Sequence, residues 1–166
     1  MLPEEVSKFI GQISDTSIFE VGKEAIRRFA DAVDDPNPLY WDEEYAKKLR
    51  YGAIIAPPGF ISSDWFSGRP TKWPKRGEAT SQAERQLSDA LLKAGYTTPV
   101  AIDAGIEYEF FYPVRAGDTI TFSSMIKDII EREGKTGKMA FITTETAYIN
   151  QNGDLVAKAR GTSMQR

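Results

Sequence analysis

The sequence predicts an α+β fold in which an antiparallel sheet wraps around a central, mostly apolar helix. Two halves of the chain differ in periodicity: residues 1 to about 66 show helical spacing with breaks, and residues 101–166 show strand-like alternation. A mostly apolar segment, 53–66, precedes the sheet, which is long enough to enclose it. We expect one domain of 166 residues with a loop and helix excursion at about 67–99.

The first half is expected to contain two amphipathic helices separated by a proline-rich turn. Residues 22–33 place four apolar side chains on one helical face: Ile26, Phe29, Ala30 and Val33. Pro36 and Pro38 end this helix because proline cannot donate a helical hydrogen bond. Residues 42–50 carry acids in the first turn and bases in the last, as the helix dipole favours. Two short elements come earlier, a helix over 3–10 and an extended run over 17–21.

The apolar segment and the excursion are expected to supply two further helices. The first covers residues 57–66, buried on most sides, with two prolines in its first turn. The excursion then begins as a loop rich in prolines and basic residues. Its second part has apolar side chains at helical spacing before a closing glycine: Ala83, Leu87, Ala90, Leu91 and Ala94. A connection this long in a compact domain is usually functional or mobile.

The second half alternates apolar and polar residues in four segments that we interpret as an antiparallel meander. The strands are centred on residues 106–111, 120–126, 139–149 and 155–164. Turn sequences separate them at 114–118, at 133–138 and at the Asn152–Gly153 pair, which is a strong hairpin signal.

Composition excludes several classes of chemistry. The chain has neither cysteine nor histidine, so it offers no thiol nucleophile, no imidazole base and no thiolate or imidazole metal ligand. A net charge of -3 argues against general nucleic-acid binding. The sequence shows no apolar run of 18 residues and no basic, apolar leader at its start, so we expect a cytoplasmic protein. No metal is expected.

One stretch resembles a known motif. The sequence FADAVDDPNPLYWDEEYAKKLRYGAIIAPPGF, residues 29–60, is similar to the hydratase motif of MaoC-like, hot-dog-fold acyl-thioester hydratases and dehydratases. Asp35, Asn37, Pro38 and Leu39 match it, and Tyr40 stands where the family has histidine. The stretch YPVRAGDTITFSSMIKDI also resembles the family's strand–turn–strand. The resemblance covers the chain outside the excursion and is strongest to the MaoC N-terminal subgroup, which is similar to the dehydratase of type I fatty acid synthases.

The resemblance implies a hot-dog fold, paired units, and binding of an enoyl-CoA or enoyl-carrier thioester in a tunnel near the pair's interface. In the family, the motif aspartate and histidine activate water for addition across the double bond. A backbone N–H at the start of the buried helix polarises the thioester carbonyl. No separate cofactor is implied, because coenzyme A or phosphopantetheine belongs to the substrate.

Two motif residues are candidates for catalysis. Asp35 is able to orient water, but an aspartate after a helix end and before proline also commonly braces a turn. Tyr40, with an ordinary pKa of about 10, is a poor base at neutral pH. Its alternative role is packing or hydrogen bonding in a half-buried wall. Asn37 is a substrate-binding candidate and equally a normal turn residue.

Further substrate-binding candidates follow the motif. Gly59 and Phe60 carry the first free N–H groups after two prolines, near a helix start where the dipole is positive. Gly59 has the alternative role of permitting close packing. Four more candidates would line an acyl tunnel or meet the phosphates of coenzyme A or a carrier: Trp65, Arg69, Lys72 and Trp73. The alternative role for Trp65 is core packing, and the alternative for Arg69 and Lys72 is a solvated loop.

From these residues we predict a subunit of an enoyl-thioester hydratase or 3-hydroxyacyl-thioester dehydratase. It would be the incomplete half that pairs with a second hot-dog chain carrying the Asp/His pair. Two alternatives stay open: an autonomous homodimeric hydratase or thioesterase using Asp35 and Tyr40, and an acyl-CoA binding module without catalysis. Glu107 and Glu109 share one strand face and are either buried acids or, by default, exposed.

Overall fold

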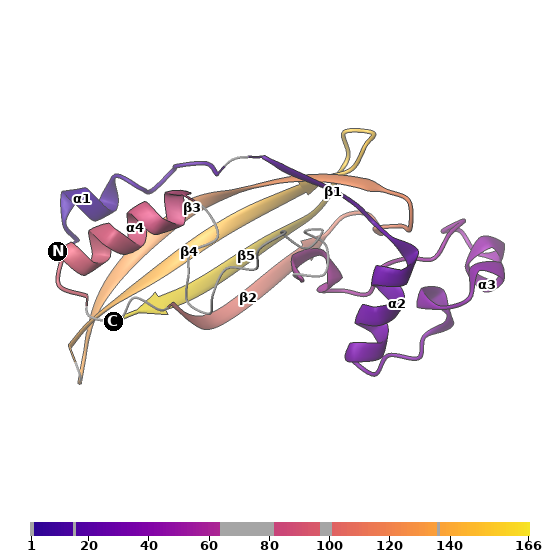
Figure 1. Ribbon diagram of the computed structural model, residues 1–166, viewed down its shortest axis with the longest axis horizontal. Helices are drawn as coiled ribbons and strands as arrows, with labels where there is room; N and C mark the ends of the chain where they lie inside the picture. The colour runs from indigo at the N-terminus through magenta and orange to yellow at the C-terminus, as the bar shows by residue number, and fades with distance from the viewer. Residues whose placement is uncertain (1, 15, 64–81, 97–100, 136) are drawn as a thin grey trace.

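Five antiparallel strands form one twisted sheet in the order β1-β3-β4-β5-β2 (Figure 1). The computed structural model describes residues 2–14, 16–63, 82–96, 101–135 and 137–166. The strands are β1 (Ser17–Glu20), β2 (Ile102–Phe110), β3 (Thr119–Gly134), β4 (Gly137–Ile149) and β5 (Leu155–Gln165). The predicted meander is confirmed for β3, β4 and β5, which follow one another as neighbours, but it is wrong for β2, which pairs with β5 and not with β3.

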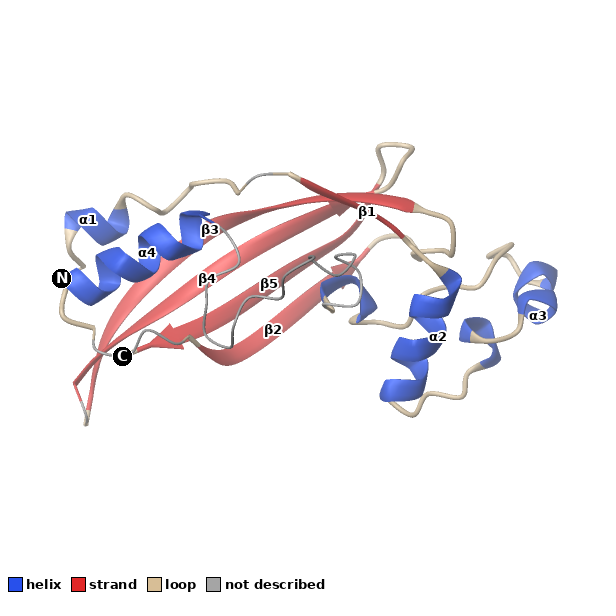
Figure 2. Ribbon diagram, viewed as in Figure 1, coloured by secondary structure: helices blue, strands red, loops and turns tan. Residues whose placement is uncertain are grey.

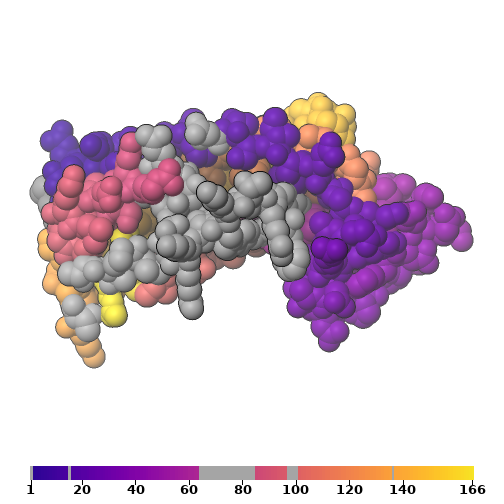
Figure 3. All heavy atoms as spheres, viewed as in Figure 1, coloured from indigo at the N-terminus to yellow at the C-terminus, as the bar shows by residue number. Residues whose placement is uncertain are grey.

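Helices occupy two places relative to the sheet (Figure 2). At one end lie α1 (Glu4–Ser7) and α4 (Gln82–Lys93), side by side over the strands. At the other end lie α2 (Lys23–Ala32), α3 (Glu43–Lys48) and two 3-10 turns, η1 (Pro38–Tyr40) and η2 (Phe60–Ser62). The space-filling view shows the same separation, with the α2 and α3 region projecting beyond the sheet (Figure 3).

The apolar core is divided in the same way. One cluster joins α2 and the motif turn to the near ends of the strands through Ile26, Tyr40, Phe60, Ile120 and Tyr148. The second joins α1 and α4 to the far ends of β3 and β4; its central residues are Val6, Leu91, Tyr96, Ile129 and Ile142. Strands β3 and β4 contribute to both clusters and therefore connect them.

Several predicted elements are confirmed, and one is wrong. Helix α2 confirms the apolar face at Ile26, Phe29 and Ala30, but not at Val33, which follows the last helical residue and is 52% exposed. Helix α4 confirms the helix expected within the excursion. The expected helix over 57–66 is, as far as Ser63, only the 3-10 turn η2. Gly59 has φ +84°, and the hydroxyls of Ser62 and Ser63 donate to the carbonyls of Gly59 and Phe60, which competes with regular helix formation.

No helix among the described residues is long and apolar enough to cross a membrane. Within the same residues, no group of three or more histidine, cysteine, aspartate or glutamate side chains is placed to hold a metal ion.

Candidate active site

The motif forms a tight turn at the C-terminal end of α2. Asp34 adopts a left-handed conformation with φ +53°, which reverses the chain, and the Asp35 N–H donates to the carbonyl of Ala30 at 2.9 Å. One carboxylate oxygen of Asp35 then accepts the Asn37 N–H at 3.1 Å. The side-chain oxygen of Asn37 accepts the Leu39 N–H, also at 3.1 Å, and so caps η1. Two successive side-chain turns of this kind are local chemistry that aspartate and asparagine favour.

The turn is attached to its neighbours by polar contacts to the backbone. The indole N–H of Trp41 donates to the Asp35 carbonyl at 3.0 Å, and Arg27 on α2 donates to the Trp41 carbonyl at 2.8 Å. An ion pair between Lys23 and Glu43 joins α2 to α3. These contacts hold the motif in one position relative to α2.

Tyr40, at the histidine position of the motif, is buried. Its ring is 7% exposed and lies in the first core cluster. Burial raises the pKa of the Tyr40 hydroxyl, the Asp35 carboxylate raises it further, and a hydrogen bond to the Asn37 side chain lowers it. The net direction is upward, so the hydroxyl stays protonated at neutral pH and is not a base.

Asp35 also borders an open hollow of ≈ 260 Å³ beside the turn. The hollow is lined by Ala30, Asp31, Asp34, Asp35, Pro36 and Trp41. Tyr40 is absent from its wall because its ring points into the core. The structure therefore brings Asp35, Asn37 and Tyr40 together in one turn, and of these three only Asp35 lines this hollow.

Gly59 and Phe60 lie at the start of η2, against α2. The Phe60 N–H donates to the Pro57 carbonyl at 3.1 Å, and its ring packs edge-on against Phe29 with centroids 5.6 Å apart. No hydrogen bond from the Gly59 N–H to another described residue is found. A Cβ on Gly59 would meet Phe29 at an ordinary 3.9 Å, so its left-handed φ, and not lack of space, requires glycine.

A group of hydroxyls beneath η2 was not indicated by the sequence pattern. The Tyr108 hydroxyl on β2 is hydrogen-bonded to the hydroxyl of Ser62. Tyr148 lies nearby; burial and then Tyr108 raise its pKa to about 12, while a hydrogen bond to Thr146 lowers it. Ser124 and Thr146 share a hydrogen bond of 2.8 Å on the same face of the sheet. In the sequence, the only signal for this group is the alternation of Tyr108 with Glu107 and Glu109, which indicates that the Tyr108 ring points to the inner face of the sheet. No sequence pattern indicates its contact with Ser62, because the two residues are far apart in the chain.

The remaining sequence candidates divide into two groups. Trp65, Arg69, Lys72 and Trp73 lie outside the described residues, so their roles stay predictions. Glu107 and Glu109 are exposed, which confirms the default reading. They line a hollow of ≈ 390 Å³ on the outer face of the sheet with Tyr108, Glu145, Lys158 and Arg160.

Comparison with known proteins adds family information to this geometry. A family profile described as FAS1-like, dehydratase domain region, matches residues 8–159. A UPF0336 protein of Streptomyces avermitilis is 38% identical over 122 residues, covering 73% of this chain and 71% of that protein. A protein of Thermomonospora curvata named probable enoyl-CoA hydratase alpha subunit is 32% identical over 136 residues, covering 81% of this chain and 41% of that protein.

Solved structures agree with the fold. The HadBC complex of Mycobacterium tuberculosis, a (3R)-hydroxyacyl-ACP dehydratase, aligns with a TM-score of 0.66 and 27% identity over 94% of this chain and 96% of that one. The ChsH1–ChsH2 complex of the same organism aligns with a TM-score of 0.79 at 17% identity, covering 98% of this chain and 94% of that one. At that identity the second likeness concerns the fold alone, and together they confirm the hot-dog fold expected from the sequence.

Proposed function

The chain belongs to the family of FAS1-like, MaoC-like hot-dog dehydratases, and from this premise we propose that it is one subunit of an enoyl-thioester hydratase or 3-hydroxyacyl-thioester dehydratase. We further propose that it is the incomplete half, and that a second hot-dog chain supplies the Asp/His pair. The observation that carries this proposal is the motif turn, in which Tyr40 is buried and protonated and Asp35 uses a carboxylate oxygen to brace the backbone.

Hydration of an enoyl thioester needs a base that takes a proton from water, an acid that protonates the α-carbon, and a donor for the enolate-like oxygen. Tyr40 is unsuited to the first role because its pKa is raised above an ordinary value that is already far from neutrality. It is unsuited to the second because its hydroxyl is hydrogen-bonded to the half-buried Asn37 within the same turn. Both proton transfers are therefore assigned to the partner chain.

The contribution proposed for this chain is structural and oxyanion-binding. The Gly59 N–H is the backbone donor best suited to a thioester carbonyl, since the Phe60 N–H is already used within the turn. Coenzyme A or phosphopantetheine would arrive as part of the substrate, with no separate cofactor. The names of related proteins support a heteromeric assembly: HadBC is a complex, and the Thermomonospora relative is called an alpha subunit.

An assay of crotonyl-CoA hydration by the purified chain, monitored as the loss of enoyl absorbance, tests the proposal. We expect the chain alone to give no turnover above background. We also expect purification of the tagged chain from its native host to yield a second hot-dog chain, and the resulting complex to be active.

The alternative is an autonomous enzyme, which the hollow beside Asp35 favours. Turnover by the chain alone that Asp35→Asn abolishes, and that Asp34→Asn leaves intact, would contradict the incomplete-subunit proposal. Asp34 is a matched control because its carboxylate borders the same hollow. If the chain purifies from its host with no second hot-dog chain and shows no turnover, the acyl-CoA binding alternative gains the support that the subunit proposal loses.

A further inference from the structure

We propose that Tyr108 on β2 and Ser62 on η2 are positioning residues for the backbone N–H of Gly59. Through two hydrogen bonds in series, the pair holds Gly59 in the conformation that presents its N–H to a thioester carbonyl. The inference rests on the proposed function, which assigns oxyanion binding to Gly59, and it adds the side chains on which that role depends.

Gly59 is a residue that needs restraint from its surroundings. Its φ is +84°, in the left-handed region, and glycine has the widest conformational range of all residues. Its N–H belongs to the peptide shared with Pro58, and its carbonyl belongs to the peptide shared with Phe60. Rotation about Gly59 therefore changes the angle between the two peptides. Because an oxyanion donor works through preorganisation, both peptides must be fixed.

The peptide before Gly59 is fixed by a short backbone bridge. Ile54 accepts and Ala56 donates hydrogen bonds of 2.9 and 2.8 Å with the segment 114–116. Two prolines follow, and their rings lock φ. The chain therefore reaches Gly59 from a fixed direction.

The peptide after Gly59 is held by Ser62. The Ser62 N–H donates to the Gly59 carbonyl at 3.2 Å, and the Ser62 hydroxyl donates to the same carbonyl at 3.3 Å. Among the described residues, however, no backbone hydrogen bond joins η2 to a strand of the sheet. The turn packs on the core through Phe60 and Ile61, and such apolar contacts are not directional. Ser62 fixes Gly59 only if another group orients η2.

Tyr108 supplies that directional contact. Its hydroxyl is hydrogen-bonded to the hydroxyl of Ser62. A serine hydroxyl has one hydrogen, and that of Ser62 is directed to the Gly59 carbonyl, so Tyr108 donates and Ser62 accepts. The hydrogen bonds thus run in one direction, from Tyr108 through Ser62 to the peptide of Gly59.

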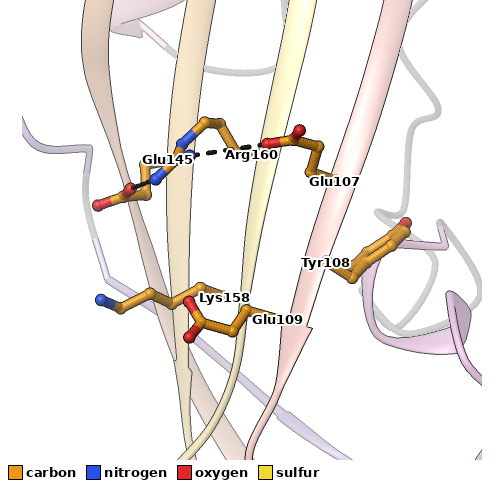
Figure 4. A pocket seen from close by; sticks show the side chains of 6 residues that line it. All are labelled: Glu107, Tyr108, Glu109, Glu145, Lys158 and Arg160. Atoms are coloured by element: carbon orange, nitrogen blue, oxygen red, sulfur yellow. Dashed lines mark hydrogen bonds and ion pairs between the residues drawn. The ribbon is translucent and has the colours of Figure 1, made fainter.

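The position of Tyr108 suits it to this role. Tyr108 pairs with Ala159 in the ladder between β2 and β5, and its ring stacks on Phe110 with centroids 5.5 Å apart. Figure 4 shows its side chain pointing to the opposite side of β2 from Glu107 and Glu109. The hydroxyl of Tyr108 is therefore held by a regular strand on the face of the sheet that η2 covers.

A contribution to folding alone is the simpler explanation of this contact, and the two roles differ in what they predict. Ser62 is exposed, so water replaces Tyr108 as its partner when the phenol is removed, and the effect on stability is small. An oxyanion donor must lie at about 2.7–3.1 Å from the oxygen that it stabilises, so a small displacement of Gly59 weakens transition-state binding strongly. Positioning therefore predicts a loss of turnover out of proportion to the loss of stability.

The first test measures the mobility of Gly59 in the full chain, labelled with 15N-glycine, by NMR relaxation. The order parameter of the Gly59 N–H should be about 0.85 in wild type and should fall to about 0.6 or below in Tyr108→Phe and in Ser62→Ala. Ser62→Thr keeps the hydroxyl and should keep the wild-type value. Tyr112→Phe alters a tyrosine that is 56% exposed and is the matched control. Circular dichroism checks that every variant is folded.

The second test measures crotonyl-CoA hydration by the complex isolated from the host. Tyr108→Phe should lower kcat by about 10-fold and leave KM within about twofold, because the contact acts on the transition state. The double variant Tyr108→Phe/Ser62→Ala should lose no more than the weaker single variant, since both residues act through one series of bonds. Ser63→Ala removes a hydroxyl that donates to the Phe60 carbonyl in the same turn, and it should leave kcat unchanged.

Two results overturn the inference. One is a Gly59 N–H that stays as ordered in Tyr108→Phe as in wild type. The other is an unchanged kcat in Tyr108→Phe although Gly59 has become mobile. Failure of the proposed function gives a different signal, namely no turnover by the wild-type complex. The relaxation measurement does not depend on turnover, so it decides in either case whether Tyr108 and Ser62 hold Gly59.

Discussion

Tyr40 occupies the position at which the motif has histidine, and this one side chain decides whether the turn is a packed element or a proton-transfer site. The neighbouring residues keep the motif's spacing, and Asp35 and Asn37 both serve as acceptors for backbone N–H groups. A phenol fits the apolar space beneath η1 and keeps its proton because burial and the Asp35 charge raise its pKa. The same position in the sequence therefore supports folding without supporting base catalysis.

Tyr40→Phe tests this assignment. The ring is retained, so the loss is one partly buried hydrogen bond to Asn37, which we expect to lower the free energy of unfolding by about 1 kcal/mol. Turnover of the complex isolated from the host should stay within twofold of wild type. Urea unfolding and the hydratase assay measure the two effects.

Tyr45→Phe, which alters an exposed tyrosine on α3, is the control and should change neither quantity. A hundredfold loss of turnover in Tyr40→Phe, with stability nearly unchanged, would assign Tyr40 to catalysis.

At the scale of elements, pairs of strands are joined by charges as well as by backbone bonds. Glu145 on β4 accepts from Arg160 on β5 at 2.8 Å, and its side chain is 18% exposed. The hydrogen bond from Arg160 lowers the pKa of Glu145, and the nearby Lys127 and Lys158 act in the same direction against the effect of burial. This carboxylate therefore favours the folded state while it is ionised.

The pH dependence of unfolding follows from that shift. A carboxyl whose pKa is lower in the folded state stabilises fully above its ordinary pKa of about 4.3, and the stabilisation is lost as pH falls through the folded-state value. Wild type should therefore lose more stability between pH 6 and pH 3 than Glu145→Gln does. Urea unfolding across that range measures the difference.

Glu133→Gln, which removes an exposed carboxylate from β3, should keep the wild-type pH dependence. Parallel curves for wild type and Glu145→Gln would show that the Arg160 contact contributes nothing.

At the scale of the whole molecule, two core clusters share the two longest strands. α4 covers one end of β3 and β4, and α2 with the motif turn covers the other. Because each of these strands runs through both clusters, loss of one cluster removes support from the other. We expect the protein to unfold in one cooperative transition despite its divided core.

Leu91→Ala tests that cooperativity. Leu91 is a fully buried residue of α4, so its truncation should cost about 2–5 kcal/mol and shift the whole transition, as monitored by both circular dichroism and tryptophan fluorescence. The adjacent Leu92 is 40% exposed, and Leu92→Ala should cost far less. Separation of the two signals in Leu91→Ala would mean that the clusters unfold independently.

Local patterns in the sequence identified most elements correctly. Alternation located the four strands after residue 100, helical spacing located α2 and α4, and Asp42 caps α3 where the charge pattern placed a helix start. The motif turn was also recognisable, since aspartate, asparagine and proline form it through contacts between near neighbours. Apolar content was misleading at residues 57–66, where it indicated a helix. A left-handed Gly59 and two serine hydroxyls permit only a short turn up to Ser63.

The sequence by itself determined the period of each segment, the chemistry of the motif and the absence of histidine, because these depend on residues close together in the chain or on composition. Only the tertiary structure decided that α4 packs on the sheet, that Tyr40 points into the core, and that Glu107 and Glu145 flank Arg160. Those outcomes depend on strand register, which brings together residues far apart in sequence, and no local pattern specifies which long-range pairing has the lowest free energy.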